Sequence, residues 1–308
     1  MRTVILGAGA VGGYFGGRLA KAGFPVSFLV RPARFETLSS NGLVVRSVHG
    51  DFSLNPTLLK KAEEAENPEL VIVGLKNYHL EGALTDLEIL AKKGAKVLPL
   101  LNGIQHVDRL IEVLGVENVL GGSCYIESTL NAKGEIVHTS PMHDIVFGAV
   151  SPETTEAFLD SLEEMLRTAE IPYKRSRSIL AEMWNKYIFL ASLSGITSAV
   201  RQPIGAALKD PVTFSFLSDL VSEVCQVAQS RGITLPEDLV DVVLSRMQGI
   251  SPNMTSSMHR DLEKGQPLEL ESLHGALLRM AKEAGLKTPS IRAVYALLHP
   301  YQNGQPNL

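Results

Sequence analysis

Three glycines near the start of the chain have the spacing that lets a backbone approach a phosphate group. The segment Gly7-Ala8-Gly9-Ala10-Val11-Gly12 follows a short apolar run and precedes a helical pattern. In such a unit Gly7 permits a tight turn, Gly9 admits a pyrophosphate, and Gly12 lets the helix pack closely on the sheet. The free N–H groups of the helix start then face an anion. The motif predicts dinucleotide binding, and a glycine turn without a ligand is the alternative.

Arg31, at the end of the next apolar run, indicates which dinucleotide would bind. Enzymes that use NAD usually carry an acidic residue about 20 positions beyond the glycines, where it binds the ribose 2′-hydroxyl. This chain carries Arg31 there, followed by Arg34. A guanidinium pairs with a 2′-phosphate through charge and parallel hydrogen bonds, so the sequence favours NADP(H). A solvent-facing loop arginine is the alternative.

Two further residues have side chains suited to acid–base chemistry. Lys186 stands in an apolar stretch, where a partly buried amine would be a usable proton donor, although an amine that extends to solvent fits the pattern equally well. Glu269 comes just before a helix together with Glu271, and capping alone would explain carboxylates at that place. No Gly-x-Ser-x-Gly, HExxH or CxxC motif is present, so we expect no serine triad and no metal.

Buried strands that alternate with helices must position these groups. Apolar runs at residues 3–6, 26–31, 70–75 and 96–101, with helical patterns between them, predict a Rossmann-type, doubly wound parallel sheet. Ligands of such sheets bind at the carboxyl ends of the strands, which is where Lys76 and Asn102 fall. Turn signals over residues 119–146 predict an antiparallel extension of the sheet.

The pattern changes near residue 172, beyond which nearly everything is helical and is interrupted only by prolines. We therefore expect two domains, a dinucleotide-binding Rossmann-type domain over 1–172 and an all-α substrate and catalytic domain over 173–308. Because pockets favour domain interfaces, the substrate is expected in a cleft to which both halves contribute.

The composition is that of an ordinary globular protein. Of 308 residues, 45% are hydrophobic and 20% charged, and 29 basic residues against 33 acidic ones leave a net charge of −4, which favours neither nucleic acid nor an anionic membrane as partner. The uncharged run from Tyr187 to Val200 is too short for a membrane span, and the start of the chain does not resemble a secretory signal. A cytoplasmic protein that acts on a small molecule is expected.

Several segments together resemble the ketopantoate reductase family, the 2-dehydropantoate 2-reductases, over nearly the whole chain. The resemblance rests on the order and spacing of the glycine motif, Arg31, Leu75-Lys76, Leu101-Asn102-Gly103, Trp184-Asn185-Lys186, Ser256-Ser257-Met258, Asp261, Glu269 and His274-Gly275. The family reduces a 2-oxo acid with NADPH on the route to pantothenate and coenzyme A. The resemblance therefore implies a small-molecule 2-oxo acid substrate, and a homodimer is compatible with it.

The resemblance also implies roles for individual residues. Arg31 would hold the 2′-phosphate, and Lys76 and Asn102 would line the cofactor and substrate cleft. Lys186 would be the general acid that stabilises and protonates the alkoxide formed by hydride transfer. Glu269 would position that lysine or a substrate hydroxyl, and Ser257 would contact the substrate carboxylate.

This chain departs from the family pattern at substrate-contacting positions. Leu190 and Ser194 stand where the biosynthetic enzymes carry asparagines, and His274-Gly275 replaces an Asn-Gly pair. Loss of two amide contacts would leave polar groups of ketopantoate less well satisfied. Three hypotheses follow: a reductase of ketopantoate, a reductase of a less polar 2-oxo acid, and a non-catalytic protein that senses NADP(H).

Overall fold

The computed structural model describes residues 1–306, and these form two compact units. The first unit comprises residues 1–101 and 106–182. The second comprises residues 102–105 together with the chain from residue 183 onward. The short loop 102–105 therefore belongs to the second unit, although its neighbours on both sides in the sequence belong to the first.

A five-stranded, all-parallel sheet forms the centre of the first unit. Its strands stand in the order β5-β2-β1-β6-β7, so the chain winds outward from β1 in both directions. Their bounds are β1 (Thr3–Leu6), β2 (Val26–Leu29), β5 (Thr57–Leu59), β6 (Leu70–Val73) and β7 (Lys96–Pro99). The predicted Rossmann-type, doubly wound sheet is thereby confirmed.

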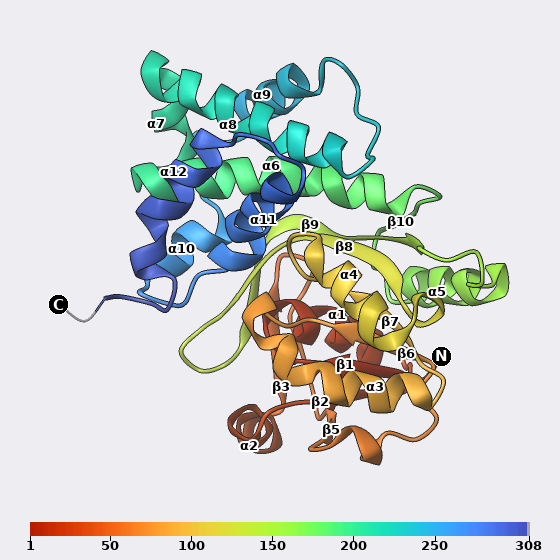
Figure 1. The fold of residues 1–308 in the computed structure, drawn as a ribbon. Helices are drawn as coiled ribbons and strands as arrows, with labels where there is room; N and C mark the ends of the chain where they lie inside the picture. Colours follow the sequence, from red (N-terminus) through yellow and green to blue (C-terminus); the bar gives the residue numbers. More distant parts are fainter. Residues whose placement is uncertain (307–308) are drawn as a thin grey trace. The chain divides into compact units, whose positions relative to one another are not determined.

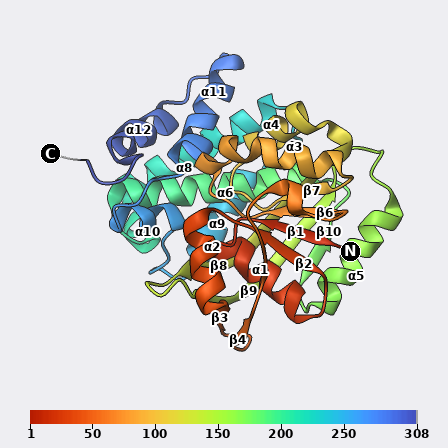
Figure 2. The same cartoon turned by 90° about the horizontal axis from the view of Figure 1, so that it is seen from below.

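Alternating side chains of these strands fill two separate hydrophobic cores, one on each face. Ile5, Phe28 and Ile72 belong to one core, which includes side chains of α1 (Ala10–Lys21) and α5 (Glu156–Thr168). Val4 and Val71 point the other way, into a core formed with α3 (Leu84–Lys92) and α4 (Gln105–Leu114). Both faces of a parallel sheet are usually covered in this way, and Figure 2 shows α1 and α3 on opposite sides of the strands.

The stretch expected to extend this sheet forms a second one. The long strands β8 (Leu120–Leu130) and β9 (Ile136–Ala149) pair antiparallel, as their turn signals predicted. However, β9 also pairs in parallel with β3 (Leu43–Ser47) and β10 (Tyr173–Arg175), and β4 (Phe52–Leu54) completes the set. An isolated parallel bridge between Val97 and Val119 links the two sheets.

Several shorter helices connect these strands. Their bounds are α2 (Pro32–Asn41), η1 (Ala62–Glu64), η2 (Asn77–His79), η3 (Glu81–Ala83) and η4 (Val116–Asn118). Between β6 and β7, where the sequence predicts a helical pattern, the chain forms two tight 3-10 turns followed by α3. The turns bring the chain from the end of β6 to the sheet face that α3 covers.

The second unit is helical throughout its described length, as the sequence predicted (Figure 1). Its elements are α6 (Ile179–Val200, shared with the first unit), α7 (Ile204–Lys209), α8 (Pro211–Ser230), α9 (Leu239–Gly249), α10 (Ser257–Glu263), the π-helical turn η5 (Glu271–Gly275), α11 (Ala276–Glu283), α12 (Pro289–Leu298) and η6 (His299–Tyr301). The buried Glu223 of α8 accepts the N–H groups of Ser290 and Ile291, both at 2.9 Å, and so caps α12. Among the described residues no helix is long and apolar enough to cross a membrane.

The units divide at residues 182/183 rather than at the expected 172/173. The chain stays with the first unit because Tyr173 of β10 pairs with Ile145 of β9. Farther along, Ile179 packs so closely on Gly121 that a Cβ on that glycine would lie 2.6 Å from its side chain. The first turn of α6 therefore belongs to the sheet unit, and only the remainder of that helix belongs to the helical one.

Gly12 is the position in the first unit where we expect a methyl group to be least tolerated. A Cβ there would lie 2.1 Å from the carbonyl oxygen of Gly7, which is backbone and cannot rotate away. Gly12→Ala should destabilise the first unit by about 1–3 kcal/mol, measured as a lower midpoint of unfolding in urea. Gly82→Ala is the matched control, because a Cβ there meets nothing within 4 Å. Equal midpoints for the two variants would contradict the packing described here.

Candidate active site

The turn between β1 and α1 leaves a helix start open. Gly7 has φ +93°, and its N–H donates to the carbonyl of Leu29 at 3.0 Å, so the turn closes tightly against β2. Gly9 is the N-cap of α1, and no side chain caps the helix. A Cβ on Gly9 would meet only the carbonyl oxygen of Gly74, at 3.8 Å. The first N–H groups of a helix without a side-chain cap bind anions well.

Two of the predicted cofactor residues follow the strands on either side of β1. The register pairs Leu6 with both Leu29 of β2 and Val73 of β6, so the ends of these three strands lie side by side. Arg31 comes two residues after β2 and is exposed, and Lys76 is half-buried after β6. The structure therefore brings a cation to each side of the glycine turn within one unit.

The electrostatics of this edge are consistent with a cationic surface. The pKa of His79, three residues beyond Lys76, is lowered mainly by burial and further by the positive charge of Arg31. A neutral imidazole next to an exposed guanidinium leaves the site with positive charge near neutral pH. Such an edge favours an anionic ligand.

Arg34 has a different role from Arg31, which spacing alone did not reveal. Its Nε donates to the carbonyl of Ala8 at 2.8 Å, and its Nη1 donates to the carbonyl of Gly134 at 2.9 Å. The guanidinium thus joins the glycine turn to the hairpin between β8 and β9. Burial lowers the pKa of Arg34. Arg34 braces the turn, whereas Arg31 remains exposed to solvent.

In the second unit a buried carboxyl group is held by an amide. Glu269 is only 5% exposed, and its Oε2 accepts a hydrogen bond from Nδ2 of Asn102 at 3.3 Å. The adjacent Gly103 has φ +84°, and a Cβ there would lie 2.8 Å from the carbonyl oxygen of Ser272. The loop that carries Asn102 therefore packs directly on the turn that follows Glu269. These residues are 167 positions apart, so only the fold brings them together.

Glu271, which the sequence did not separate from Glu269, is occupied elsewhere. Its carboxylate accepts a hydrogen bond from Nη1 of Arg279 at 2.9 Å and another from the hydroxyl of Tyr295. Arg279 also donates to the side chain of Gln105 at 2.9 Å. Glu271 is exposed and belongs to a surface ion pair. Glu269 is thus the one of the two whose carboxyl group is buried beside Asn102.

Helix α6 carries three of the predicted residues at intervals of four. Lys186 and Leu190 are both half-buried. Ser194 is fully buried, and its hydroxyl has no hydrogen-bond partner among the described residues. Where the resemblance implies an amide, the structure therefore has a short, buried hydroxyl group.

Ser256 and Ser257 differ in their local roles. Ser256 is the N-cap of α10, and its hydroxyl accepts the N–H of His259 at 3.0 Å. His259 reaches α6 through Nδ1, which lies 2.8 Å from the carbonyl oxygen of Thr197. Ser257 is half-buried at the first position of α10. The cap and the histidine fix α10 against α6 and so determine where Ser257 lies.

Two other features of the first unit do not form competing sites. His49 stacks on both His138 and His143. Ring nitrogens of His49 and His138 lie 2.9 and 3.0 Å from the carbonyl oxygens of Pro141 and Met142, respectively. Among the described residues no group of three or more His, Cys, Asp or Glu is arranged to hold a metal ion. These histidines therefore act as structural hydrogen-bonding groups.

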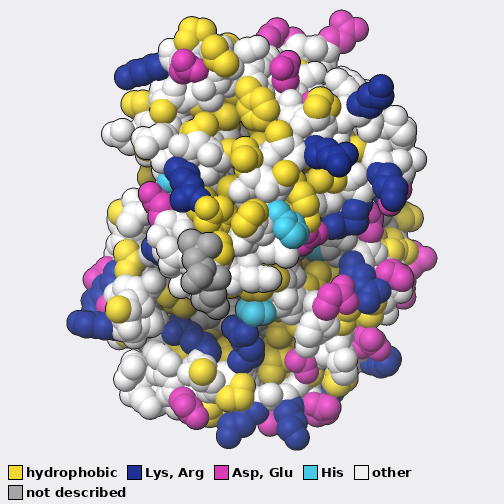
Figure 3. Space-filling model, turned by 60° about the vertical axis from the view of Figure 1, so that its left-hand side comes forward, with side chains coloured by type: hydrophobic (Ala, Val, Ile, Leu, Met, Phe, Trp, Pro, Cys, Tyr) yellow, Lys and Arg dark blue, Asp and Glu magenta, His cyan; other side chains and the backbone are white. Residues whose placement is uncertain are grey.

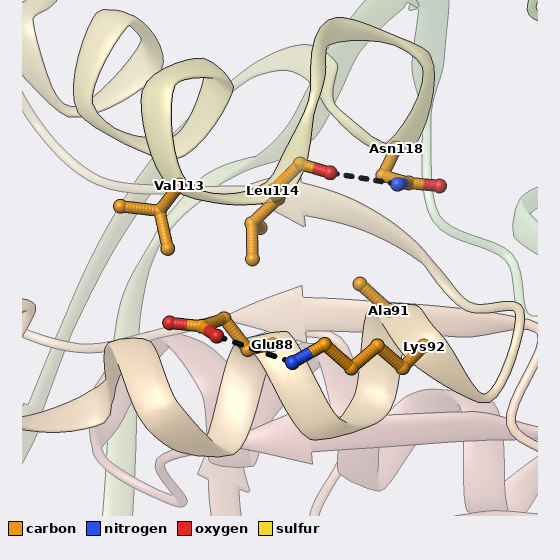
Figure 4. A pocket seen from close by; sticks show the side chains of 6 residues that line it. All are labelled: Glu88, Ala91, Lys92, Val113, Leu114 and Asn118. Carbon is orange, nitrogen blue, oxygen red and sulfur yellow. Dashed lines mark hydrogen bonds and ion pairs between the residues drawn. The ribbon is translucent and has the colours of Figure 1, made fainter.

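A small hollow between α3 and the chain that follows it is the other feature (Figure 4). It is lined by Glu88, Ala91, Lys92, Val113, Leu114 and Asn118. Lys92 pairs with Glu88 across one helical turn at 3.4 Å, and Asn118 donates to the carbonyl of Leu114 at 2.7 Å. The polar groups of its rim are thus engaged with one another. None of the predicted site residues lines it.

The face drawn in Figure 3 shows no broad area of charge of one sign. On the face drawn in Figure 3, the coloured basic and acidic side chains are interspersed. This distribution agrees with the net charge of −4. Proteins that bind nucleic acid usually gather Lys and Arg on one surface.

Comparison with family models matches both halves of the chain. Residues 3–152 match the model described as "Ketopantoate reductase PanE/ApbA", and residues 178–302 match its C-terminal counterpart. The glycine motif, Arg31, Lys76 and Asn102 lie within the first match. Lys186, Ser257 and Glu269 lie within the second.

Similar proteins span almost the full length of this chain. The uncharacterized oxidoreductase YkpB of Bacillus subtilis (strain 168) is 37% identical over 302 residues, which cover 98% of this chain and 99% of that protein. The crystal structure of 2-dehydropantoate 2-reductase from Geobacter metallireducens GS-15 is 28% identical, with a TM-score of 0.87 and coverage of 97% and 99%. D-mandelate dehydrogenase with NADH and anilino(oxo)acetate has a TM-score of 0.87 at 23% identity and covers 98% of both chains, which shows a shared fold.

Two substitutions distinguish the stabilising hydrogen bonds of Arg34 from the exposed charge of Arg31. Arg34→Met keeps the aliphatic stem but leaves the carbonyls of Ala8 and Gly134 without their donors. We expect a loss of about 1–3 kcal/mol in the free energy of unfolding. Arg31→Met, at an exposed position, should change it by less than about 0.5 kcal/mol. Urea unfolding of both variants measures the difference, and similar losses would mean that Arg34 does not brace the turn.

Proposed function

This chain belongs to the ketopantoate reductase family of oxidoreductases, and from that premise we propose that it reduces the carbonyl group of a 2-oxo acid with NADPH. The leading substrate is 2-dehydropantoate, which would become pantoate on the route to pantothenate. The family and its chemistry follow from the two matched models. The choice of cofactor, substrate and catalytic residues is the proposal.

The first unit is suited to a pyridine dinucleotide phosphate. Gly9 offers an open backbone at the start of α1, where a pyrophosphate would accept the first N–H groups. Arg31 lies beyond β2, where the adenosine ribose of a dinucleotide falls in this fold, and its exposed guanidinium would pair with a 2′-phosphate. Lys76 would contact the cofactor from the end of β6. NADPH, when bound, supplies the hydride for the carbonyl carbon.

The observation that carries the catalytic part of the proposal is the pairing of Glu269 with Asn102. A carboxyl group that is 5% exposed is costly unless other groups satisfy it. Here an amide donor from a distant loop satisfies one oxygen at 3.3 Å. Buried polar pairs of this kind are typical of sites that handle a proton, and the same unit also carries the half-buried Lys186.

The proposed residue roles account for the proton that the reduction requires in addition to the hydride. As hydride reaches the carbonyl carbon of the substrate, negative charge develops on the carbonyl oxygen, and the ammonium group of Lys186 stabilises that charge and donates a proton to it. The products are a 2-hydroxy acid and the oxidised dinucleotide. Glu269 orients the lysine or a substrate hydroxyl, Asn102 orients Glu269 and the substrate, and the hydroxyl of Ser257 binds the substrate carboxylate.

Leu190 favours a second candidate substrate. It is half-buried one helical turn beyond Lys186, at a position where the resemblance implies an amide, and Ser194 is buried. An apolar side chain there would suit a 2-oxo acid that lacks the hydroxyl of ketopantoate. D-mandelate dehydrogenase, with an aromatic ligand named in its complex, shares this fold, which makes aromatic and branched 2-oxo acids rational test substrates. Loss of catalysis with retained NADP(H) binding is the remaining alternative.

Lys186→Met tests the proposed proton donor. We expect kcat to fall by about 10²–10⁴-fold, because a positioned general acid contributes that much, while the Kd for NADPH stays unchanged. The measurement is NADPH oxidation with 2-dehydropantoate, 2-oxo-3-methylbutanoate and phenylglyoxylate. Undiminished turnover in the variant would remove the lysine from the mechanism. Tight NADPH binding by the unaltered protein without turnover of any of the three would favour a sensor.

Arg31→Ala tests the preference for the phosphorylated cofactor. A hydrogen-bonded charge on a phosphate contributes about 1.5–3 kcal/mol, so the Kd for NADPH should rise by roughly 10–100-fold. The Kd for NADH, which has no 2′-phosphate, should change little. Calorimetric titration of both nucleotides provides the comparison. Equal losses would refute the assignment of Arg31 to the 2′-phosphate.

A further inference from the structure

The carbonyl oxygen of Ser272 is a point where three segments of the second unit meet. A Cβ on Gly103 would lie 2.8 Å from it, so the loop that follows Asn102 touches it directly. The hydroxyl of Tyr187 lies 3.4 Å from it and donates to the next carbonyl, that of Leu273. The third segment is the π-helical turn itself, η5. Each segment therefore reaches this point close to one of the residues assigned above to the reaction.

Tyr187 is suited to act as a permanent donor at this point. It follows Lys186 directly in α6, and its side chain is 1% exposed. Burial raises the pKa of its phenol, so the hydroxyl keeps its proton at all pH values near neutrality. A phenol that stays protonated can hold a backbone carbonyl without changing the local charge.

His274 makes the complementary contact in the opposite direction. It is fully buried in the π-helical turn, and its Nε2 lies 3.0 Å from the carbonyl oxygen of Ala191 in α6. Because a carbonyl can only accept, Nε2 carries the proton. Burial lowers the pKa of His274 to about 4, so the ring is neutral. Gly195 makes room for it, since a Cβ there would lie 2.7 Å from Nε2.

The two hydrogen bonds between α6 and η5 run in opposite directions, and together they restrain the two segments more than a single hydrogen bond would. Tyr187 and Ala191 are one turn apart on α6, and their partners Leu273 and His274 are adjacent in η5. A single hydrogen bond would act as a pivot. A second bond, one turn away, opposes both sliding and rotation of the two segments.

The geometry of the π-helical turn explains why its register with α6 needs to be held. In η5 the N–H of Ala276 bonds to the carbonyl of Glu271, five residues earlier, so the turn contains one residue more than an α-helix would. If that extra residue were lost to a regular α-turn, residues before it would rotate by about 100° around the axis relative to α11. Glu269 lies just before the turn and would move with them.

We propose that Tyr187 and His274 are positioning residues, which hold the turn of α6 that bears Lys186 in one register with the segment that bears Glu269. The inference rests on the proposed function, because it concerns the same lysine and glutamate. Neither side chain needs to touch the reacting atoms. A misplacement of about 1 Å in a catalytic group can cost about 10²-fold in rate.

The test compares four variants of the full chain in steady-state kinetics with the best 2-oxo acid substrate. Tyr187→Phe removes only the hydroxyl group, and His274→Leu removes the N–H donor of the ring. We expect each substitution to lower kcat by about 10–100-fold, whereas KM should change less than threefold. His274→Gln, which restores an N–H donor near the position of Nε2, should recover most of kcat. Tyr301→Phe is the control, since that ring packs on Arg201 in the same unit and should leave kcat unchanged.

NADPH-binding stoichiometry separates positioning from misfolding. If the role is positioning, Tyr187→Phe and His274→Leu each still bind one equivalent of NADPH with unchanged Kd while their kcat falls. A kcat within twofold of the unaltered protein for both Tyr187→Phe and His274→Leu overturns the inference, and so does a loss of binding stoichiometry that matches the loss of kcat. Lys186→Met in the same series identifies which proposal fails. Retained activity in it overturns the proposed function together with this inference, whereas lost activity in it alone overturns only the positioning.

Discussion

The first unit depends on a close approach of two backbones that leaves no space for a side chain. Gly12 at the start of α1 and Gly74 at the end of β6 lie so near one another that a Cβ on Gly74 would be 2.5 Å from the Cα of Gly12. This contact sets α1 tightly on the sheet. It also fixes the direction of the helix start toward the strand ends where Arg31 and Lys76 lie. The open start of α1 is thus a consequence of how the helix packs.

The second unit buries several polar groups, and two of them are paired with distant parts of the chain. Glu269 and His274 are both nearly or fully inaccessible to water, and each finds its partner in a distant part of the chain. In both cases the partner lies on a segment that carries another of the proposed reactive residues. Unpaired groups of this kind would cost about 1–3 kcal/mol each, so the pairing helps determine a single arrangement of α6, the 102–105 loop and the π-helical turn.

This chain belongs to the family, yet it differs from the family pattern at a few positions of the second unit. The chain matches the family models over most of its length, and the glycine motif lies within the first match. The resemblance implies amides at three positions of α6 and the turn that it contacts, where this chain carries Leu190, Ser194 and His274. His274 does not leave a gap there, because it donates to the carbonyl of Ala191. The side chain of His274 is therefore held by the backbone of α6.

The sequence by itself determined the strand and helix order of the first unit and the helical nature of the second. Short apolar runs such as Leu70–Val73 alternate with amphipathic stretches, and this periodicity is local, so it can be interpreted without knowing any partner. Only the tertiary structure decided which member of a similar pair does what. Arg31 and Arg34, like Glu269 and Glu271, have the same chemistry within a few residues. Arg31 and Glu271 are exposed, whereas Arg34 is half-buried and Glu269 is buried, which depends on carbonyls and amides contributed by residues far away in the chain. Long-range contacts leave no local pattern, and for that reason the braces made by Arg34, Tyr187 and His274 emerged only from the folded chain.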